Sequence, residues 1–201
     1  MSDAPALVLA SKSFGRRAML ENAGVPFVAD VAQVDEAAVK DALKVENATA
    51  EQAAETLAEL KAKRVAPRHG GALVIGADSI LDLDGEWFDK PEDIASARDH
   101  LMRLRGRRHR IVSAAVLVRD DARLWHQTDA ATLDMREFSE TFVDEYLAHV
   151  GERATQSVGA YQIEGPGVQL FSRIQGDPFT IIGMPLLPLL EILRQHAVIV
   201  P

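Results

Sequence analysis

The stretch ALVLASKSFGRRAML, residues 6–20, is typical of a buried strand that ends in a polar turn and leads into a helix. The strand-like apolar run stops at Ser11. Apolar residues return at helical spacing at Met19, Leu20 and Val25, after a turn with two serines, a glycine and two adjacent arginines. Because a helix N-terminus favours negative charge, this turn is a candidate anion site. The alternative, which the spacing alone favours, is a capping serine beside two solvated arginines.

The rest of the chain alternates between strand and helix patterns and then changes to paired strands. Strands are predicted over residues 27–33, 72–78, 109–120 and 122–137. Helices are predicted over residues 34–44, 50–65, 92–104, 140–150 and 186–196, the first of them as a short helix or a loop running into one. This order favours an α/β fold with a mixed sheet, and we expect a single domain over residues 1–201.

Local signals mark the ends of several predicted elements. Thr49 and Gln52 have the spacing of a capping box, and Ser139 is the predicted N-cap of the helix that ends at Val150. The pair Asp84-Gly85 predicts a β-hairpin. The helix that follows Thr49 has an apolar stripe, which comprises Ala53, Ala54, Leu57, Ala58 and Leu60.

The composition is that of a globular protein with an acidic surface. The formal net charge is -8, so the surface as a whole repels nucleic acid and anionic lipid. The chain has no cysteine, which excludes disulfides and cysteine-based zinc sites. The start lacks the pattern of a secretory signal, and no apolar stretch is long enough to span a membrane. We therefore expect a cytoplasmic protein whose partners include neither a nucleic acid polymer nor a membrane.

An acidic segment follows the predicted strand at residues 72–78. Asp78 falls where that strand is expected to end, and ligands of α/β sheets gather at the carboxyl ends of strands. Carboxylate oxygens suit Mg²⁺ or Mn²⁺, and Lys90 nearby suits the phosphates that such a metal carries. The other acids of the segment, Asp82, Asp84, Glu86 and Asp89, are interpreted as hairpin and surface charges.

Two further segments carry weaker signals. Asp35, Glu36 and Lys61 are ordinary surface charges when each is taken alone. In SVGAYQIEGPG, residues 157–167, the glycines allow close approach of a flat ligand, Tyr161 offers a stacking face and Glu164 offers an acceptor pair. An irregular loop without a binding role explains the same composition equally well.

Three other kinds of site find little support. The basic cluster RLRGRRHR, residues 103–110, lacks interleaved aromatic residues and is better interpreted as a solvated turn than as a nucleic-acid surface. The six histidines show no metal-ligand spacing. The GxSxG elbow of many serine hydrolases is absent.

Taken together and in order, the segments resemble the Maf family of nucleoside triphosphate pyrophosphatases. The family opens with a strand and an A-S-x-S-P-x-R-R-type turn, and this chain has Phe14 where the family has proline. The other matching segments are Val34-Asp35-Glu36, LAELKA with Lys61, GADS with Asp78, Lys90-Pro91, GAYQIEG with Glu164, and IGMPL near the C-terminus. These matches extend over nearly the whole chain.

The resemblance implies an elongated α/β domain, similar to inosine triphosphatases, with a twisted mixed sheet, flanking helices and a cleft between two lobes. It implies hydrolysis of a nucleoside triphosphate to its monophosphate and pyrophosphate with a divalent metal, Mg²⁺ or Mn²⁺. Such enzymes are cytoplasmic and often dimeric, and they remove non-standard nucleotides. Asp78 is then the proton acceptor and shares the metal with Glu36. Ser11, Arg16, Lys61 and Lys90 hold phosphate oxygens and developing charge.

Base selection in the family rests on positions that correspond here to Gly15, Ser79 and Glu164, beside Tyr161. Glu164 resembles the branch that acts on 7-methylguanosine triphosphate, and its carboxylate can accept from the N–H groups of a guanine edge. That branch, however, has tryptophan where this chain has Gly15 and glutamine where it has Ser79. The resemblance therefore favours a guanine-type base without fixing it.

Two hypotheses of other classes remain. One is a regulator of cell division that binds a septum partner, a role attached to this family. The other is a nucleic-acid binder that uses the arginines of residues 103–110.

Overall fold

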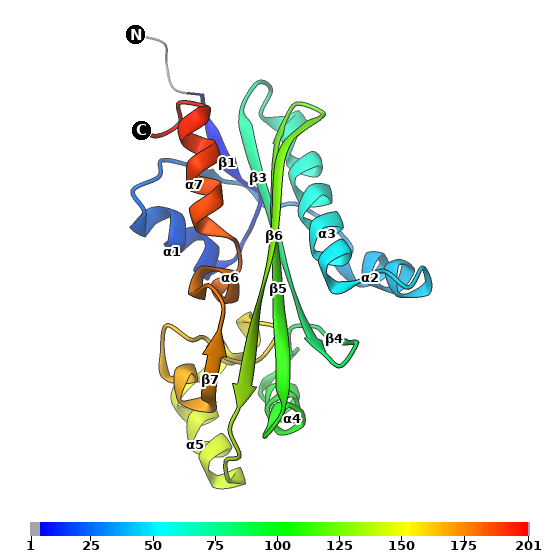
Figure 1. Cartoon of the computed structure of the whole chain (residues 1–201), viewed down its shortest axis with the longest axis vertical. Helices are drawn as coiled ribbons and strands as arrows, with labels where there is room; N and C mark the ends of the chain where they lie inside the picture. The colour runs from blue at the N-terminus through cyan, green and yellow to red at the C-terminus, as the bar shows by residue number, and fades with distance from the viewer. Residues whose placement is uncertain (1–4, 201) are drawn as a thin grey trace. The chain divides into compact units, whose positions relative to one another are not determined.

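The computed structural model describes residues 5–200 and has an α/β fold built on one mixed sheet (Figure 1). The strand order is β2-β1-β3-β5-β6-β7, and β4 pairs with β3. β1 runs parallel to β2 and β3, whereas the pairs β3–β4 and β6–β7 are antiparallel. The predicted fold class is thereby confirmed. The single domain predicted over residues 1–201 stays a prediction, and its ends, residues 1–4 and 201, lie outside the described residues.

The strands are β1 (Leu7–Leu9), β2 (Val28–Ala29), β3 (Leu73–Leu83), β4 (Glu86–Phe88), β5 (Arg108–Arg119), β6 (Ala122–Met135) and β7 (Phe171–Gln175). The α-helices are α1 (Phe14–Asn22), α2 (Glu36–Val45), α3 (Ala50–Val65), α4 (Ile94–Leu104), α5 (Glu140–Val150), α6 (Pro178–Ile182) and α7 (Leu186–Gln195). Three short 3₁₀ segments lie at Ala66–Arg68, Gly151–Gln156 and Pro166–Leu170. Among the described residues, no helix has both the length and the apolar character needed to cross a membrane.

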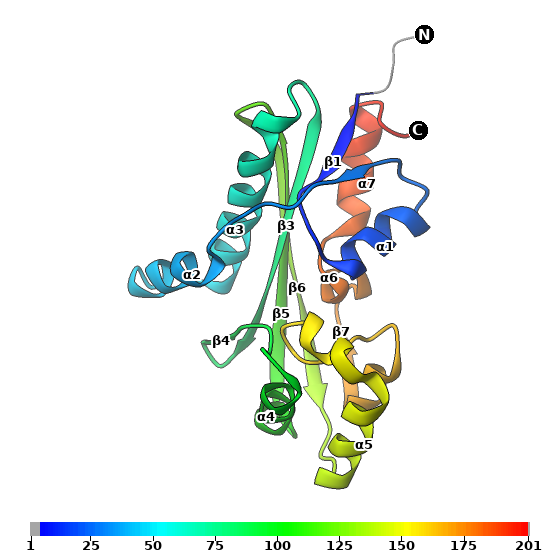
Figure 2. The ribbon, with the colours of Figure 1, turned by 180° about the vertical axis from the view of Figure 1, so that it is seen from behind.

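The described chain divides into two compact units. The first unit comprises residues 5–79, 113–129 and 183–200, and the second comprises residues 80–112 and 130–182. In the first unit, α3 covers one face of the sheet, and α1 and α7 cover the other (Figures 1 and 2). Buried side chains such as Leu9, Leu57, Ile75 and Leu193 fill the space between these layers.

The second unit has its own hydrophobic core. Leu101 and Leu104 of α4, Leu133 of β6 and Leu147 of α5 belong to this core. His109 at the start of β5 is also buried, and its Nε2 lies 2.7 Å from the hydroxyl of Tyr161. Burial lowers the pKa of His109 to about 4, so this side chain is neutral in the folded protein at pH 7.

Several local predictions are confirmed in detail. Thr49 accepts a hydrogen bond from the N–H of Gln52, whose side chain accepts from the N–H of Thr49, so the capping box is complete. Ser139 caps α5 and accepts from the N–H of Phe142. Asp84 and Gly85 both have positive φ and join β3 to β4, as expected for a tight hairpin.

Three local predictions need correction. The strand predicted over residues 27–33 is only two residues long, because the segment lies at the edge of the sheet beside β1 and none of its residues is buried. Leu60 is 39% exposed and does not belong to the buried stripe of α3. The next two residues of the helix, Lys61 and Ala62, are buried instead. The strand predicted to end at Asp78 continues to Leu83, because buried residues follow and the strand pairs with β4.

Candidate functional site

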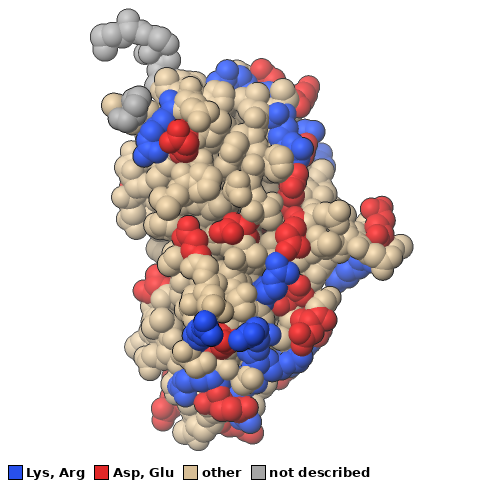
Figure 3. All heavy atoms as spheres, viewed as in Figure 1, with Lys and Arg blue, Asp and Glu red and all other residues tan. Residues whose placement is uncertain are grey.

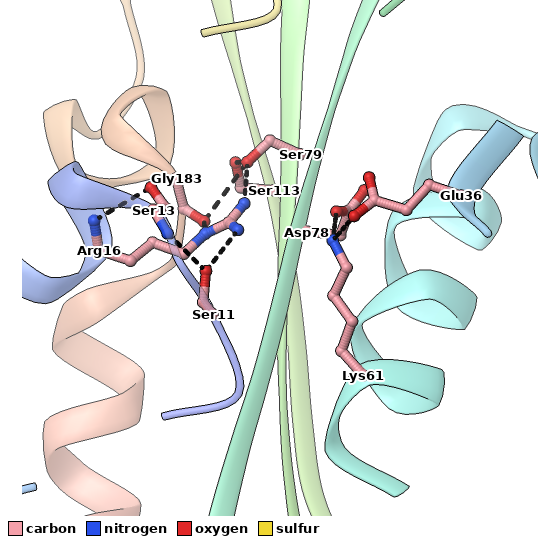
Figure 4. Close-up of polar contacts among 9 residues, drawn as sticks. All are labelled: Ser11, Ser13, Arg16, Glu36, Lys61, Asp78, Ser79, Ser113 and Gly183. Carbon is pink, nitrogen blue, oxygen red and sulfur yellow. Dashed lines mark hydrogen bonds and ion pairs between the residues drawn. The ribbon is translucent and has the colours of Figure 1, made fainter. Parts of the chain in front are cut away.

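Asp78, Lys61 and Glu36 form a charged cluster in the first unit. Lys61 on α3 donates directly to Oδ1 of Asp78 on β3 and lies 2.8 Å from Oε1 of Glu36 at the start of α2 (Figure 4). Lys61 and Asp78 are 7% and 4% exposed, whereas the Glu36 side chain is 44% exposed. The structure thus brings together three residues that lie far apart in the sequence and that the resemblance assigns to one site.

The Asp78 carboxylate has an unused acceptor. Its Oδ1 contacts Lys61, but its Oδ2 is buried and has no hydrogen-bond partner among the described residues. A buried oxygen without a partner costs free energy unless a ligand or water satisfies it. Two nearby carboxylates with one orphaned oxygen fit a hard divalent cation, because Mg²⁺ is commonly bound by one or two carboxylates together with substrate phosphates.

The polar turn before α1 holds a cap and a buried serine. Ser13 is the N-cap of α1 and accepts from the N–H of Arg16 at 3.4 Å. Ser11 is buried, and its Oγ accepts from the N–H of Ser13 at 3.2 Å. The turn is therefore folded by its own side chains, as the capping alternative predicts. One of its two arginines is nevertheless turned inward rather than into solvent.

The side chain of Arg16 is buried and held by three neutral acceptors. Its Nε donates to the Gly183 carbonyl at 2.8 Å, its Nη2 to Oγ of Ser79 at 2.9 Å, and its Nη1 to Oγ of Ser11 at 3.4 Å. Ser79 in turn lies 2.8 Å from Oγ of Ser113 on β5. We call Ser11, Arg16, Ser79, Ser113 and Gly183 the Arg16 network (Figure 4).

The charge of Arg16 is poorly compensated. Burial lowers its pKa, and the charges of Asp78 and Glu36 oppose this effect. The hydrogen bonds of its guanidinium all go to hydroxyl or carbonyl oxygens, so within the described chain no carboxylate binds it directly. Each Nη carries a second N–H beyond the bond described. A buried guanidinium of this kind is suited to bind an anion such as a phosphate.

Two members of the Arg16 network are absent from the sequence prediction. Ser113 lies inside the apolar strand IVSAAVLV, where a serine that is 0% exposed needs a hydrogen-bond partner. This lone polar residue in a buried strand is a signal that the sequence does contain. Gly183 belongs to the matched IGMPL segment, but the role of its carbonyl depends on tertiary structure alone.

The remaining predicted residues divide between the two units. Gly15 is half-buried in the first turn of α1, in the same unit as Asp78 and Arg16. Lys90, Tyr161 and Glu164 belong to the second unit, where Lys90 and Glu164 are exposed. The roles assigned to these four residues stay predictions.

Tyr161 is part of the core of the second unit. Its side chain is 5% exposed, its hydroxyl shares a hydrogen bond with His109, and its ring packs edge-on against Phe171 with 4.8 Å between centroids. Burial raises the pKa of Tyr161 above its usual value. The residue therefore anchors the segment at residues 157–167, and its predicted stacking on a base stays a prediction.

The arginines of residues 103–110 are all paired with acids of the second unit. The pairs are Arg103–Glu86, Arg105–Glu137, Arg107–Asp84, Arg108–Asp134 and Arg110–Asp82. On the face drawn in Figure 3, basic and acidic side chains are interspersed. This pairing supports the interpretation of the cluster as a solvated turn and gives no support to a nucleic-acid surface.

Comparisons with known proteins show which family this chain belongs to. The family model described as Maf-like protein matches residues 6–196. A "Nucleoside triphosphate pyrophosphatase" of Paramagnetospirillum magneticum is 55% identical over 96% of this chain and 100% of its own length.

Two further relatives differ in name. A "Nucleoside triphosphate pyrophosphatase" of Granulibacter bethesdensis is 50% identical over 94% of this chain and 96% of its own length. A "7-methyl-GTP pyrophosphatase" of Rhizobium meliloti is 49% identical over 95% of this chain and 96% of its own length. With a family match over almost all of its length and relatives at this identity, the chain belongs to the Maf-like protein family.

Proposed function

We propose that this protein hydrolyses a nucleoside triphosphate to the nucleoside monophosphate and pyrophosphate. The observation that carries the proposal is the presence in one unit of a buried guanidinium with neutral partners and a buried carboxylate, one oxygen of which has no partner within residues 5–200. The names of relatives about 50% identical over nearly the whole chain support the same reaction.

The phosphate chain is bound from the side of α1. Arg16 has N–H groups beyond those used by its three acceptors. Its positive charge is buried, so water screens it less and its attraction to an anion is strong. The N-terminus of α1 adds backbone N–H groups and the positive end of its dipole. We propose that Lys90, an exposed lysine of the second unit, also binds phosphate oxygens.

Asp78 is the proposed proton acceptor for the attacking water. Lys61 fixes its Oδ1, which leaves Oδ2 to accept the proton. The water oxygen forms a bond to the α-phosphorus, the bond from the α-phosphorus to the bridging oxygen breaks, and pyrophosphate leaves with that oxygen. We propose that Asp78 and Glu36 hold a divalent cation, which neutralises part of the triphosphate charge when bound.

The preferred base is proposed to be of the guanine type, because Glu164 offers two acceptor oxygens on an exposed side chain. A narrower alternative is specificity for 7-methylguanosine triphosphate, the activity named for the relative from Rhizobium meliloti. Hydrolysis of such nucleotides would remove modified or non-standard triphosphates from the cytoplasm. The homodimer implied by the family stays a prediction, which sedimentation analysis tests.

A substrate panel tests the proposed function. Purified protein with Mg²⁺ or Mn²⁺ is given 7-methylguanosine, guanosine, uridine and thymidine triphosphates, and pyrophosphate and orthophosphate are measured separately. We expect pyrophosphate from at least one substrate and a loss of roughly 100-fold or more in kcat for Asp78→Asn. Asp41→Asn, which changes an exposed acid on α2, is the matched control and keeps the wild-type rate. Orthophosphate as the product, or an Asp78→Asn variant with full activity, contradicts the proposal.

A further inference from the structure

The hydroxyl of Ser79 contacts three polar atoms of the protein. Its Oγ accepts from Nη2 of Arg16 at 2.9 Å, lies 2.8 Å from Oγ of Ser113, and is 3.4 Å from the carbonyl oxygen of Gly183. Figure 4 shows the Ser79 hydroxyl between the guanidinium and Ser113. Ser79, the residue after the proposed proton acceptor Asp78, therefore has its side chain directed towards Arg16.

A count of hydrogens shows what Ser79 can still do. A serine hydroxyl has one hydrogen to donate and two lone pairs with which to accept. Because Arg16 has no acceptor atom, it uses one lone pair of Ser79. The single hydrogen of Ser79 goes either to Ser113 or, when Ser113 is the donor, to the carbonyl of Gly183. In both arrangements, Ser79 has no hydrogen left to donate to a nucleotide base, and it keeps a lone pair free to accept only when it donates to Ser113.

Gly183 binds the same guanidinium beside Ser79. Its carbonyl accepts from Nε of Arg16 at 2.8 Å, and its φ of +145° is a conformation that other residues rarely adopt. A Cβ at this position would stand 3.0 Å from Nε of Arg16. The guanidinium is thus held at Nε by a backbone carbonyl and at Nη2 by the hydroxyl of Ser79, which in turn contacts Ser113.

We propose that Ser79 and Ser113 are positioning residues that fix the guanidinium of Arg16 for phosphate binding, and that Ser79 acts through Arg16 instead of selecting the base. This inference rests on the proposed function. It assigns a role to Ser113, which is 0% exposed, and it changes the role that the family resemblance gives to Ser79. Loss of the hydroxyl leaves Nη2 of Arg16 without its acceptor, so the guanidinium is held less firmly and phosphate binding weakens whatever base is attached.

The two roles of Ser79 differ in what they predict for the base. Substitution of a base-selecting residue changes the ratio of kcat/KM values between substrates. Substitution of a residue that orients Arg16 lowers kcat/KM by the same factor for every substrate. It also weakens the binding of a ligand that has no base, such as inorganic tripolyphosphate. Removal of one hydrogen bond to a charged group corresponds to a loss of about tenfold.

The experiment measures tripolyphosphate binding by calorimetry in the presence of Mg²⁺, and kcat and KM over the substrate panel. We expect Ser79→Ala to weaken tripolyphosphate binding about tenfold and to leave the ratios between bases unchanged. Ser79→Thr keeps a hydroxyl and restores binding. Ser172→Ala on β7, which removes an exposed hydroxyl bonded to a backbone carbonyl, is the control and binds like the wild type.

Ser113 is tested by a double-mutant cycle. Because Ser113 acts through Ser79, the double variant Ser79→Ala/Ser113→Ala is expected to bind tripolyphosphate no more weakly than Ser79→Ala alone. Additive losses overturn the assigned role of Ser113. Ser79 is only half-buried, so Ser79→Ala decides the central point even where Ser113→Ala unfolds.

Two results overturn the inference as a whole. One is a Ser79→Ala variant whose ratios between bases change while tripolyphosphate binding stays at the wild-type value. The other is a Ser79→Ala variant that matches the wild type both in tripolyphosphate binding and in the ratios between bases. Calorimetry does not depend on turnover. If the protein hydrolyses no triphosphate but its tripolyphosphate binding still depends on Ser79, the proposed function is refuted and the inference about Ser79 stands.

Discussion

Gly76 on β3 lies directly against the backbone of Ala58 on α3. A Cβ at Gly76 would stand 1.9 Å from the carbonyl oxygen of Ala58 and 2.8 Å from the N–H nitrogen of Ala62. Gly76 and Asp78 are two residues apart on one strand and so face the same side of the sheet. The absence of a side chain at Gly76 therefore brings α3 close enough for Lys61 to reach Asp78.

Gly76→Ala is expected to destabilise the protein and to damage the candidate site together. The added methyl meets rigid backbone atoms, so α3 must move away from β3. We expect the free energy of unfolding to fall by about 2 kcal/mol or more, and kcat to fall as Lys61 leaves Asp78. Urea denaturation and the pyrophosphate assay measure the two effects.

Gly70→Ala is the matched control, because a Cβ at Gly70 meets nothing within 4 Å. We expect its stability to stay within about 0.5 kcal/mol of the wild type. A Gly76→Ala variant with the stability and activity of Gly70→Ala would show that the close approach of α3 does not set the site.

His109 is expected to make stability depend on pH. Burial lowers its pKa to about 4 from the usual 6.5 of histidine, so between these values the unfolded chain binds a proton that the folded chain does not. The stabilisation is fully present above pH 6.5 and is lost as the pH falls towards 4. From pH 7.5 to 5, this residue accounts for a loss of about 2 kcal/mol in the free energy of unfolding.

The variant His109→Gln isolates that contribution, since glutamine can still bond to the hydroxyl of Tyr161 but does not titrate. Urea denaturation at both pH values is expected to give a smaller loss for the variant than for the wild type. Equal losses in the two proteins would contradict the burial of a neutral histidine.

The arginines of residues 103–110 are expected not to bind nucleic acid. Each of the five is paired with a carboxylate, and the protein as a whole carries a formal net charge of -8. We expect no retention on immobilised DNA or RNA at 50 mM salt or above. The triple variant R105Q/R107Q/R108Q should elute with the wild type. Salt-dependent retention that this variant loses would refute the expectation.

The capping box at the start of α3 is expected to contribute measurable stability. Thr49→Ala removes the acceptor for the N–H of Gln52, and we expect a loss of about 1 kcal/mol in the free energy of unfolding. Thr49→Ser keeps the acceptor and serves as the control. Equal stability of all three proteins would mean that the cap contributes nothing to the fold.

Much of the local structure is predictable from the sequence, because neighbouring residues determine it. The capping box of Thr49 and the hairpin at Asp84-Gly85 depend on hydrogen bonds and φ angles within a few residues. The length of β3 is different. Asp78 marks a strand end by its charge, but the strand continues because β4 pairs with it and because Lys61 contacts the carboxylate.

The candidate site itself is only partly predictable. The family resemblance groups Asp78, Glu36 and Lys61, and the structure places them in one cluster. Spacing alone leaves Arg16 either solvated or binding an anion, because it cannot show that the side chain turns inward. The role of Ser113 depends on β5 lying beside β3 in the sheet, which brings its hydroxyl to Ser79. No local pattern in the sequence encodes that pairing.

The bond from Arg16 to the Gly183 carbonyl has a consequence for how the chain matures. The two residues are 167 positions apart, so the acceptor leaves the ribosome long after the turn that carries the arginine. Contacts of such long range form late in folding, because closing the intervening chain costs entropy. A nascent or C-terminally truncated chain that lacks residue 183 therefore lacks the acceptor for Nε of Arg16, and the contacts that hold this arginine are complete only after almost the entire protein has been made.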